Sequence, residues 1–98
     1  MTLYEQLQRE ARIASNNLKL ALNARATQRS APYRGARMDE INRRLYYLEG
    51  VLAAWALISN ATPQPARHPV VFDGALIKVI KDELNIDLEE LRKAVELA

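Results

Sequence analysis

The side chains that most often perform catalysis or bind metals are scarce in this sequence. The chain of 98 residues contains a single histidine, His68, and no cysteine. A zinc or copper site needs several nitrogen or sulfur ligands, so His68 alone does not provide one, and the lack of thiols excludes disulfides and cysteine nucleophiles. We interpret His68 as a loop residue and expect neither a metal nor a cofactor.

Carboxylates occur in adjacent pairs, but each pair lies near the expected end of a helix. The pairs are Asp39 with Glu40, Asp82 with Glu83, and Glu89 with Glu90. Acidic side chains interact favourably with helix N-termini, a more frequent role than acid or base catalysis. The scattered glycines form no phosphate-binding loop. We therefore predict that the protein is not an enzyme.

A basic stretch without acidic residues is the strongest functional signal. No acidic residue lies between Glu10 and Asp39, and residues 23–40 contain four arginines and one tyrosine. Arginine binds carboxylates and phosphates through its planar fork, and tyrosine stacks on bases. Three interpretations remain open: a solvated bend without a ligand, contact with a partner protein, and binding of nucleic acid or a phosphate-bearing small ligand. The candidate residues are Lys19, Arg25, Arg29, Tyr33, Arg34, Arg37, Arg43, Arg44 and Tyr47.

These candidates must be positioned by helices, and the first helix is predicted over residues 3 to about 27. Thr2 followed by Glu5 has the spacing of a capping box, which satisfies free amides at a helix start. An apolar stripe then recurs at steps of three or four residues. It comprises Leu3, Leu7, Ala11, Ala14, Leu18 and Leu22, and we expect Ile13, Leu20 and Ala24 to widen it on one side.

The second helix is predicted to begin near Arg37 or Asp39. Proline and glycine interrupt the pattern before it, which places a bend at 29–36. Its apolar positions are Met38, Ile41, Leu45, Leu48, Leu52 and Trp55. Two helices joined by a short bend form an antiparallel hairpin, here spanning 3–60.

Residues 51–58 are apolar on every side of the second helix, which predicts that they are enclosed. One neighbouring helix cannot enclose them, so we expect the C-terminal segment, a second copy of the chain, or both to do so. A dimer is the simplest assembly. The candidates for self-association are Val51, Leu52, Trp55 and Ile58. Gly50 precedes this run and suggests a close approach of another backbone.

The C-terminal part is predicted to be a proline-rich connection at 61–72 followed by a helix pair at 73–98. Asp73 and Asp87 are predicted caps, and Asn85 is a predicted stop. The pair also fits a helix-turn-helix, but its acidic last helix would face phosphates, so we reject that reading. The apolar side chains expected to cover 51–58 are Leu84, Ile86, Leu88, Leu91, Val95 and Leu97.

The sequence thus predicts a single all-α domain, 1–98: a long antiparallel helical hairpin with two short C-terminal helices on its apolar end. We expect a non-enzymatic binding protein, such as an adaptor, inhibitor or regulator, that contacts another protein and self-associates. The alternative is a binder of nucleic acid or a phosphate-bearing ligand through the arginine-rich bend. Neither a membrane-spanning run nor a secretory signal is visible, so we expect a cytoplasmic protein.

Overall fold

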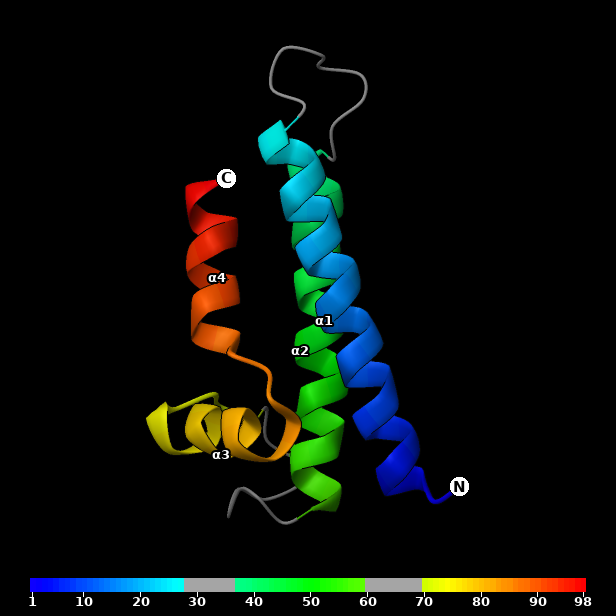
Figure 1. Cartoon of the computed structure of the whole chain (residues 1–98). Coiled ribbons are helices and arrows are strands. Elements are labelled where there is room, and N and C mark those ends of the chain that lie inside the picture. The colour runs from blue at the N-terminus through cyan, green and yellow to red at the C-terminus, as the bar shows by residue number, and fades with distance from the viewer. Residues whose placement is uncertain (28–36, 60–69) are drawn as a thin grey trace.

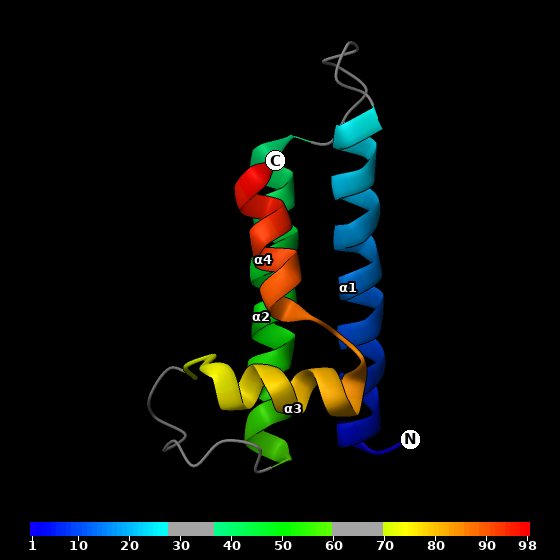
Figure 2. The ribbon, with the colours of Figure 1, turned by 60° about the vertical axis from the view of Figure 1, so that its left-hand side comes forward.

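A computed structural model describes residues 1–27, 37–59 and 70–98, and all regular structure within these ranges is helical. Its helices are α1 (Leu3–Thr27), α2 (Met38–Ile58), α3 (Gly74–Leu84) and α4 (Leu88–Leu97). Helices α1 and α2 run antiparallel, α4 lies along α2, and α3 crosses the far end of α2 (Figures 1 and 2). The predicted all-α hairpin with two C-terminal helices is confirmed. The predicted bend at 29–36 and most of the connection at 61–72 lie outside the described residues.

Side-chain caps fix the starts of α1 and α3 where the sequence predicts them. The Thr2 hydroxyl accepts a hydrogen bond from the Glu5 amide at 3.1 Å and donates one to the Glu5 carboxylate at 3.1 Å. The Asp73 carboxylate accepts a hydrogen bond from the Leu76 amide at 2.8 Å. Asn85 ends α3 in the left-handed conformation, with φ 58°, which asparagine tolerates better than most residues. Each group satisfies part of a helix end that the helix itself leaves unpaired.

The hairpin core is a seam of small residues on α1 packed against large residues on α2. Alanine side chains on α1 allow the α2 backbone to come near, and Trp55 fills the space with no exposed surface. The Tyr4 ring lies against Trp55, with 6.2 Å between centroids. The buried side chains of the seam are Ala11, Ala14, Ser15, Leu18, Ala21, Ile41, Leu45, Leu48, Leu52, Trp55 and Ala56.

The apolar stripe of α1 is narrower than the sequence predicts. Ile13 and Leu20 do not widen the buried stripe, because Leu20 is 66% exposed and Ile13 is also exposed. Both lie on the side of α1 opposite Leu18, and the helix is packed mainly on its α2 side. The exposed pair is therefore part of the outward surface of α1.

The C-terminal helices cover one side of the apolar part of α2, as predicted. Leu52, Trp55 and Ala56 are buried within a single chain, in one core with the tail. The tail contributes Leu76, Ile80, Leu84, Ile86, Leu88, Leu91 and Val95 to this core. Leu97 was expected to belong to it, but it is 87% exposed because it lies in the last turn of α4, on the side facing away from α2.

A polar contact ties α4 to α2 beside this core. Arg92 donates two hydrogen bonds to the Glu49 carboxylate, one from Nε at 3.0 Å and one from Nη2. The Arg92 guanidinium also lies over the Phe72 ring, 5.1 Å from its centroid. The Glu49 side chain is only 19% exposed, and truncation of one partner of a mostly buried pair leaves the other charge uncompensated. The contact therefore fixes the position of α4 along α2.

The cap of α4 is an ionised carboxylate whose pKa is lowered. The Asp87 carboxylate accepts a hydrogen bond from the Glu90 amide at 3.0 Å, and Lys81 lies 3.6 Å away. The amide hydrogen bond is the main cause of the lower pKa, and the charge of Lys81 adds to it. Both contacts favour the charged form of Asp87.

We predict that Asp87→Ala lowers the free energy of unfolding by about 1 kcal/mol at neutral pH, because α4 loses its cap. A lowered pKa means that the charge of Asp87 stabilises the fold at pH values above about 4, and that this contribution is lost as the pH falls through the folded-state pKa. The deficit of the variant, measured by urea denaturation, should shrink over that acidic range. A deficit that stays constant down to pH values near 2 would contradict the assignment.

Candidate docking surface

The structure places only part of the predicted basic surface. Arg29, Tyr33 and Arg34 lie outside the described residues, so their arrangement stays a prediction. Arg25 lies in the last turn of α1 and Arg37 directly before α2. These two positions flank the predicted bend.

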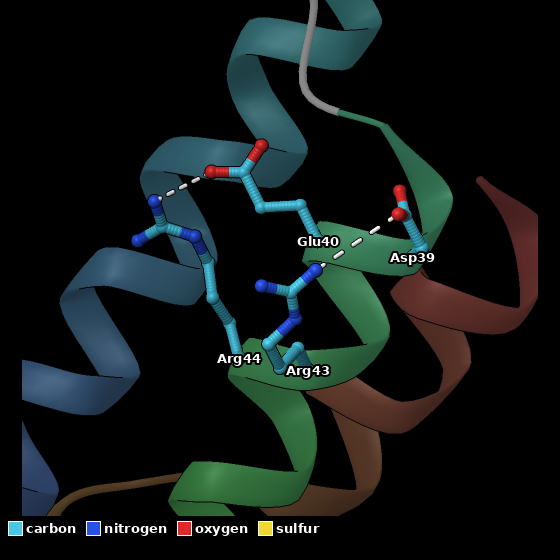
Figure 3. Close-up of polar contacts among 4 residues, drawn as sticks. All are labelled: Asp39, Glu40, Arg43 and Arg44. Atoms are coloured by element: carbon cyan, nitrogen blue, oxygen red, sulfur yellow. Dashed lines mark hydrogen bonds and ion pairs between the residues drawn. The ribbon is translucent and has the colours of Figure 1, made fainter.

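The arginines at the start of α2 are paired with carboxylates of the same helix (Figure 3). Arg44 contacts Glu40 at 2.8 Å, and Arg43 lies 3.9 Å from Asp39. Exposed pairs of this kind contribute little to stability, on the order of 0.3–0.5 kcal/mol. They do place a negative charge beside each positive one. This part of the predicted basic surface is therefore electrically balanced and less suited to a phosphate ligand than its arginines alone suggest.

Tyr47 connects the hairpin helices while keeping most of its ring in solvent. Its hydroxyl donates a hydrogen bond to the Glu10 carboxylate at 3.3 Å, which joins α2 to α1. The neighbouring Tyr46 is 67% exposed, and Tyr47 is also exposed. Two adjacent tyrosines with open rings give this surface of α2 a composition typical of binding hot spots.

The outward side of α2 beyond these tyrosines carries no charge. Between Tyr46 and Ile58 the only charged residue is Glu49, which faces Arg92. Positions 47, 50, 54 and 58 follow one another at steps of three or four, so they share one side of the helix. We call this surface the uncharged face. It consists of Tyr46, Tyr47, Gly50, Ala54 and Ile58.

The residues predicted to mediate self-association are divided by the structure. Leu52 and Trp55 are fully buried in their own chain and present no surface to a second copy. Val51 is half-buried, and Ile58 is exposed on the uncharged face. Self-association stays a prediction, but in this fold Leu52 and Trp55 act in the intramolecular core.

Gly50 is not approached closely by any other part of the described chain, so the close approach expected from the sequence is not found among these residues. A Cβ atom at this position would meet nothing within 4 Å. The residue is exposed in the middle of α2, where glycine is unfavourable relative to alanine by about 1 kcal/mol. No contact within the described chain offsets this penalty. Gly50 therefore leaves the helix backbone accessible at the centre of the uncharged face.

The uncharged face was only partly recognised from the sequence. Tyr47 and Ile58 are among the candidates predicted from the sequence. Tyr46 is suggested there only with Tyr47, as an extension of the basic surface, and Gly50 only as a site of close packing, whereas Ala54 is not singled out. Two observations together identify this face. Glu49 is the single charged residue between positions 46 and 58, and it lies on the side of α2 that faces α4. That side is known only once α4 is placed.

Other kinds of site find little support in the described part of the chain. Across residues 1–27, 37–59 and 70–98, no three carboxylate or imidazole side chains are grouped to hold a metal ion. No helix in these ranges is long and apolar enough to cross a bilayer. The sequence matches no family model, no curated protein and no solved structure. The uncharged face is therefore assessed from its own chemistry.

We predict that Gly50→Ala raises the free energy of unfolding by about 1 kcal/mol, because alanine favours the helix and the new methyl group meets no atom. Urea denaturation measures the change. Gly74→Ala is the matched control, since Gly74 is equally open but lies at the first position of α3, where helix propensity counts less. A loss of stability in Gly50→Ala would show that the space around Gly50 is occupied.

Proposed function

We propose that this chain is a non-enzymatic binding protein that docks on another protein through the uncharged face of α2. The observation that carries the proposal is the exposure of Tyr46 and Tyr47 at the start of a helix side that carries no charged side chain from position 46 to position 58. Exposed apolar surface of this kind on a small domain marks interaction sites. Adaptors, inhibitors and regulators all act by such docking, and we expect this one to act in the cytoplasm.

A protein partner suits this face better than a nucleic acid. Tyrosine offers an apolar ring and a polar hydroxyl at a low entropy cost, which favours contacts with a partly wet protein surface. Nucleic-acid binding depends on cations that neutralise phosphates. The nearest cations, Arg43 and Arg44, already face Asp39 and Glu40. Binding of nucleic acid or a phosphate-bearing ligand through the bend remains the alternative prediction.

Substitution of Gly50, at the centre of the uncharged face, tests the proposal without disturbing the fold, because the space around this residue is open. Gly50→Lys places a long charged side chain on the uncharged face, while lysine favours a helix more than glycine does. We expect this variant to fold normally but to lose the target protein in affinity purification from a lysate of the source organism. The measurement is the set of proteins retained by wild type and absent with the variant, identified by mass spectrometry.

Two control variants separate blocked docking from other effects. Gly50→Ala keeps the face uncharged and should retain the target. Gly74→Lys adds the same charge at an open glycine on α3, away from the face, and should also retain it. Retention of the same proteins by wild type and Gly50→Lys would disprove docking through this face. Steep salt dependence together with RNA in the eluate would favour the alternative.

A further inference from the structure

The outward side of α1 carries cations that no carboxylate of the described chain neutralises. Arg12 and Lys19 are exposed, and neither has an ion pair or hydrogen bond from its side chain within the described ranges. By contrast, Arg43 and Arg44 are paired within α2, and Arg92 is paired with α2. Unpaired cations aligned on one helix side offer a complementary surface to an anionic partner.

The spacing of these cations defines a line along α1. Arg12 and Lys19 are seven residues apart, which places them on nearly the same side of the helix about 10.5 Å from each other. Asn16 lies between them and, with Lys19, lines an open hollow on the surface. Ile13, which follows Arg12, is exposed beside this line. The α1 line thus combines two charges, one amide and an aliphatic side chain.

Helix α4 carries the complementary pattern on its outward side. Glu89 and Glu96 are exposed and also seven residues apart, so their spacing along the axis is again about 10.5 Å. Leu97, which follows Glu96, is 87% exposed. Glu89 has one intrachain partner, Lys93 at 3.7 Å, in an exposed i,i+4 pair of a kind that contributes little.

We propose that α4 of a second copy docks antiparallel on the α1 line, with Glu96 against Arg12 and Glu89 against Lys19. The equal spacings allow both pairs to form together. Every α-helix is right-handed, so Ile13 lies to a fixed side of Arg12 and Leu97 to a fixed side of Glu96. When the two helices face each other, these two sides coincide only if the helices run in opposite directions. Leu97 then packs beside Ile13.

The positive charge of Lys93 also lies in this contact and meets a neutral hydrogen-bond acceptor. Lys93 lies between Glu89 and Glu96 along α4 and falls opposite Asn16, whose amide oxygen accepts a hydrogen bond from an ammonium group. No cation of α1 is placed opposite Lys93 in this register. The contact therefore pairs opposite charges at both ends and a neutral amide with lysine in the middle.

A second copy is the occupant because the two patterns belong to one chain but do not meet within it. Helices α1 and α4 touch each other, but these four charged side chains are exposed, and within the described residues none of them pairs across from α1 to α4. A contact between unlike surfaces joins copies head to tail and either closes into a ring or continues. It uses no residue of the uncharged face, so it is independent of the proposed target docking.

Sedimentation velocity with charge-reversed variants tests this contact. Wild type is expected to associate at about 50 mM salt and to weaken about tenfold or more at about 500 mM, because salt screens exposed pairs. Arg12→Glu with Lys19→Glu, and separately Glu89→Lys with Glu96→Lys, should each be monomeric. Mixing the two double variants should restore association, since opposite charges then face each other in both contacts. Restoration on mixing is a result that a folding defect would not produce.

Single substitutions supply the matched control. Lys19→Glu should weaken association about tenfold, whereas Lys78→Glu, the same change at an exposed lysine on α3, should leave it unchanged; the difference corresponds to about 1.4 kcal/mol. A monomeric wild type at low salt overturns the proposal. So does association abolished by Gly50→Lys instead, which would assign the contact to the uncharged face. Binding of polyuridylate by a monomeric wild type, lost in Arg12→Glu with Lys19→Glu, would assign the α1 line to nucleic acid.

Discussion

The fold depends on how an α2 segment that is apolar on all sides is covered. A helix packed in a hairpin hides one side from water, and α1 provides that cover here. The tail hides a second side, where Leu52, Trp55 and Ala56 have almost no exposed surface. The third side, with Gly50 and Ile58, remains open. Burial of the first two sides stabilises the domain, and the third side is the surface that we propose for docking.

The tail is held by few contacts besides apolar packing. Arg92 links α4 to Glu49 and stacks on Phe72, and the Asp87 cap sets where α4 begins. Trp55 is buried in the same core as the apolar side chains of the tail, and its indole N–H has no hydrogen-bond partner among the described residues. A buried donor without an acceptor is unfavourable by about 1–3 kcal/mol. The apolar contacts around Trp55 must outweigh that penalty, so the tail and the tryptophan depend on each other.

Local signals in the sequence were sufficient for the helices but not for their exposed sides. The caps at Thr2, Asp73 and Asp87 and the stop at Asn85 were predictable because each depends on residues within a few positions. The exposure of Leu20 and Leu97 was not, since periodicity shows an apolar residue but not whether a neighbouring helix covers it. Likewise, the pairing of Arg44 with Glu40 was missed because basic residues were weighed without the acidic residues one turn before.

The distribution of ion pairs refines where a partner can bind. Charges on α2 are balanced within the helix or by α4, so the docking that we propose for its open side depends on shape and apolar surface. The cations on the outward side of α1, such as Arg12, lack such balance and attract negative charge over a distance of about 10 Å at moderate salt. The domain thus has an uncharged surface on α2 and a positively charged surface on α1. Recognition through Tyr46 should persist at high salt, whereas any contact through Arg12 should weaken, and this difference in salt response separates the two surfaces experimentally.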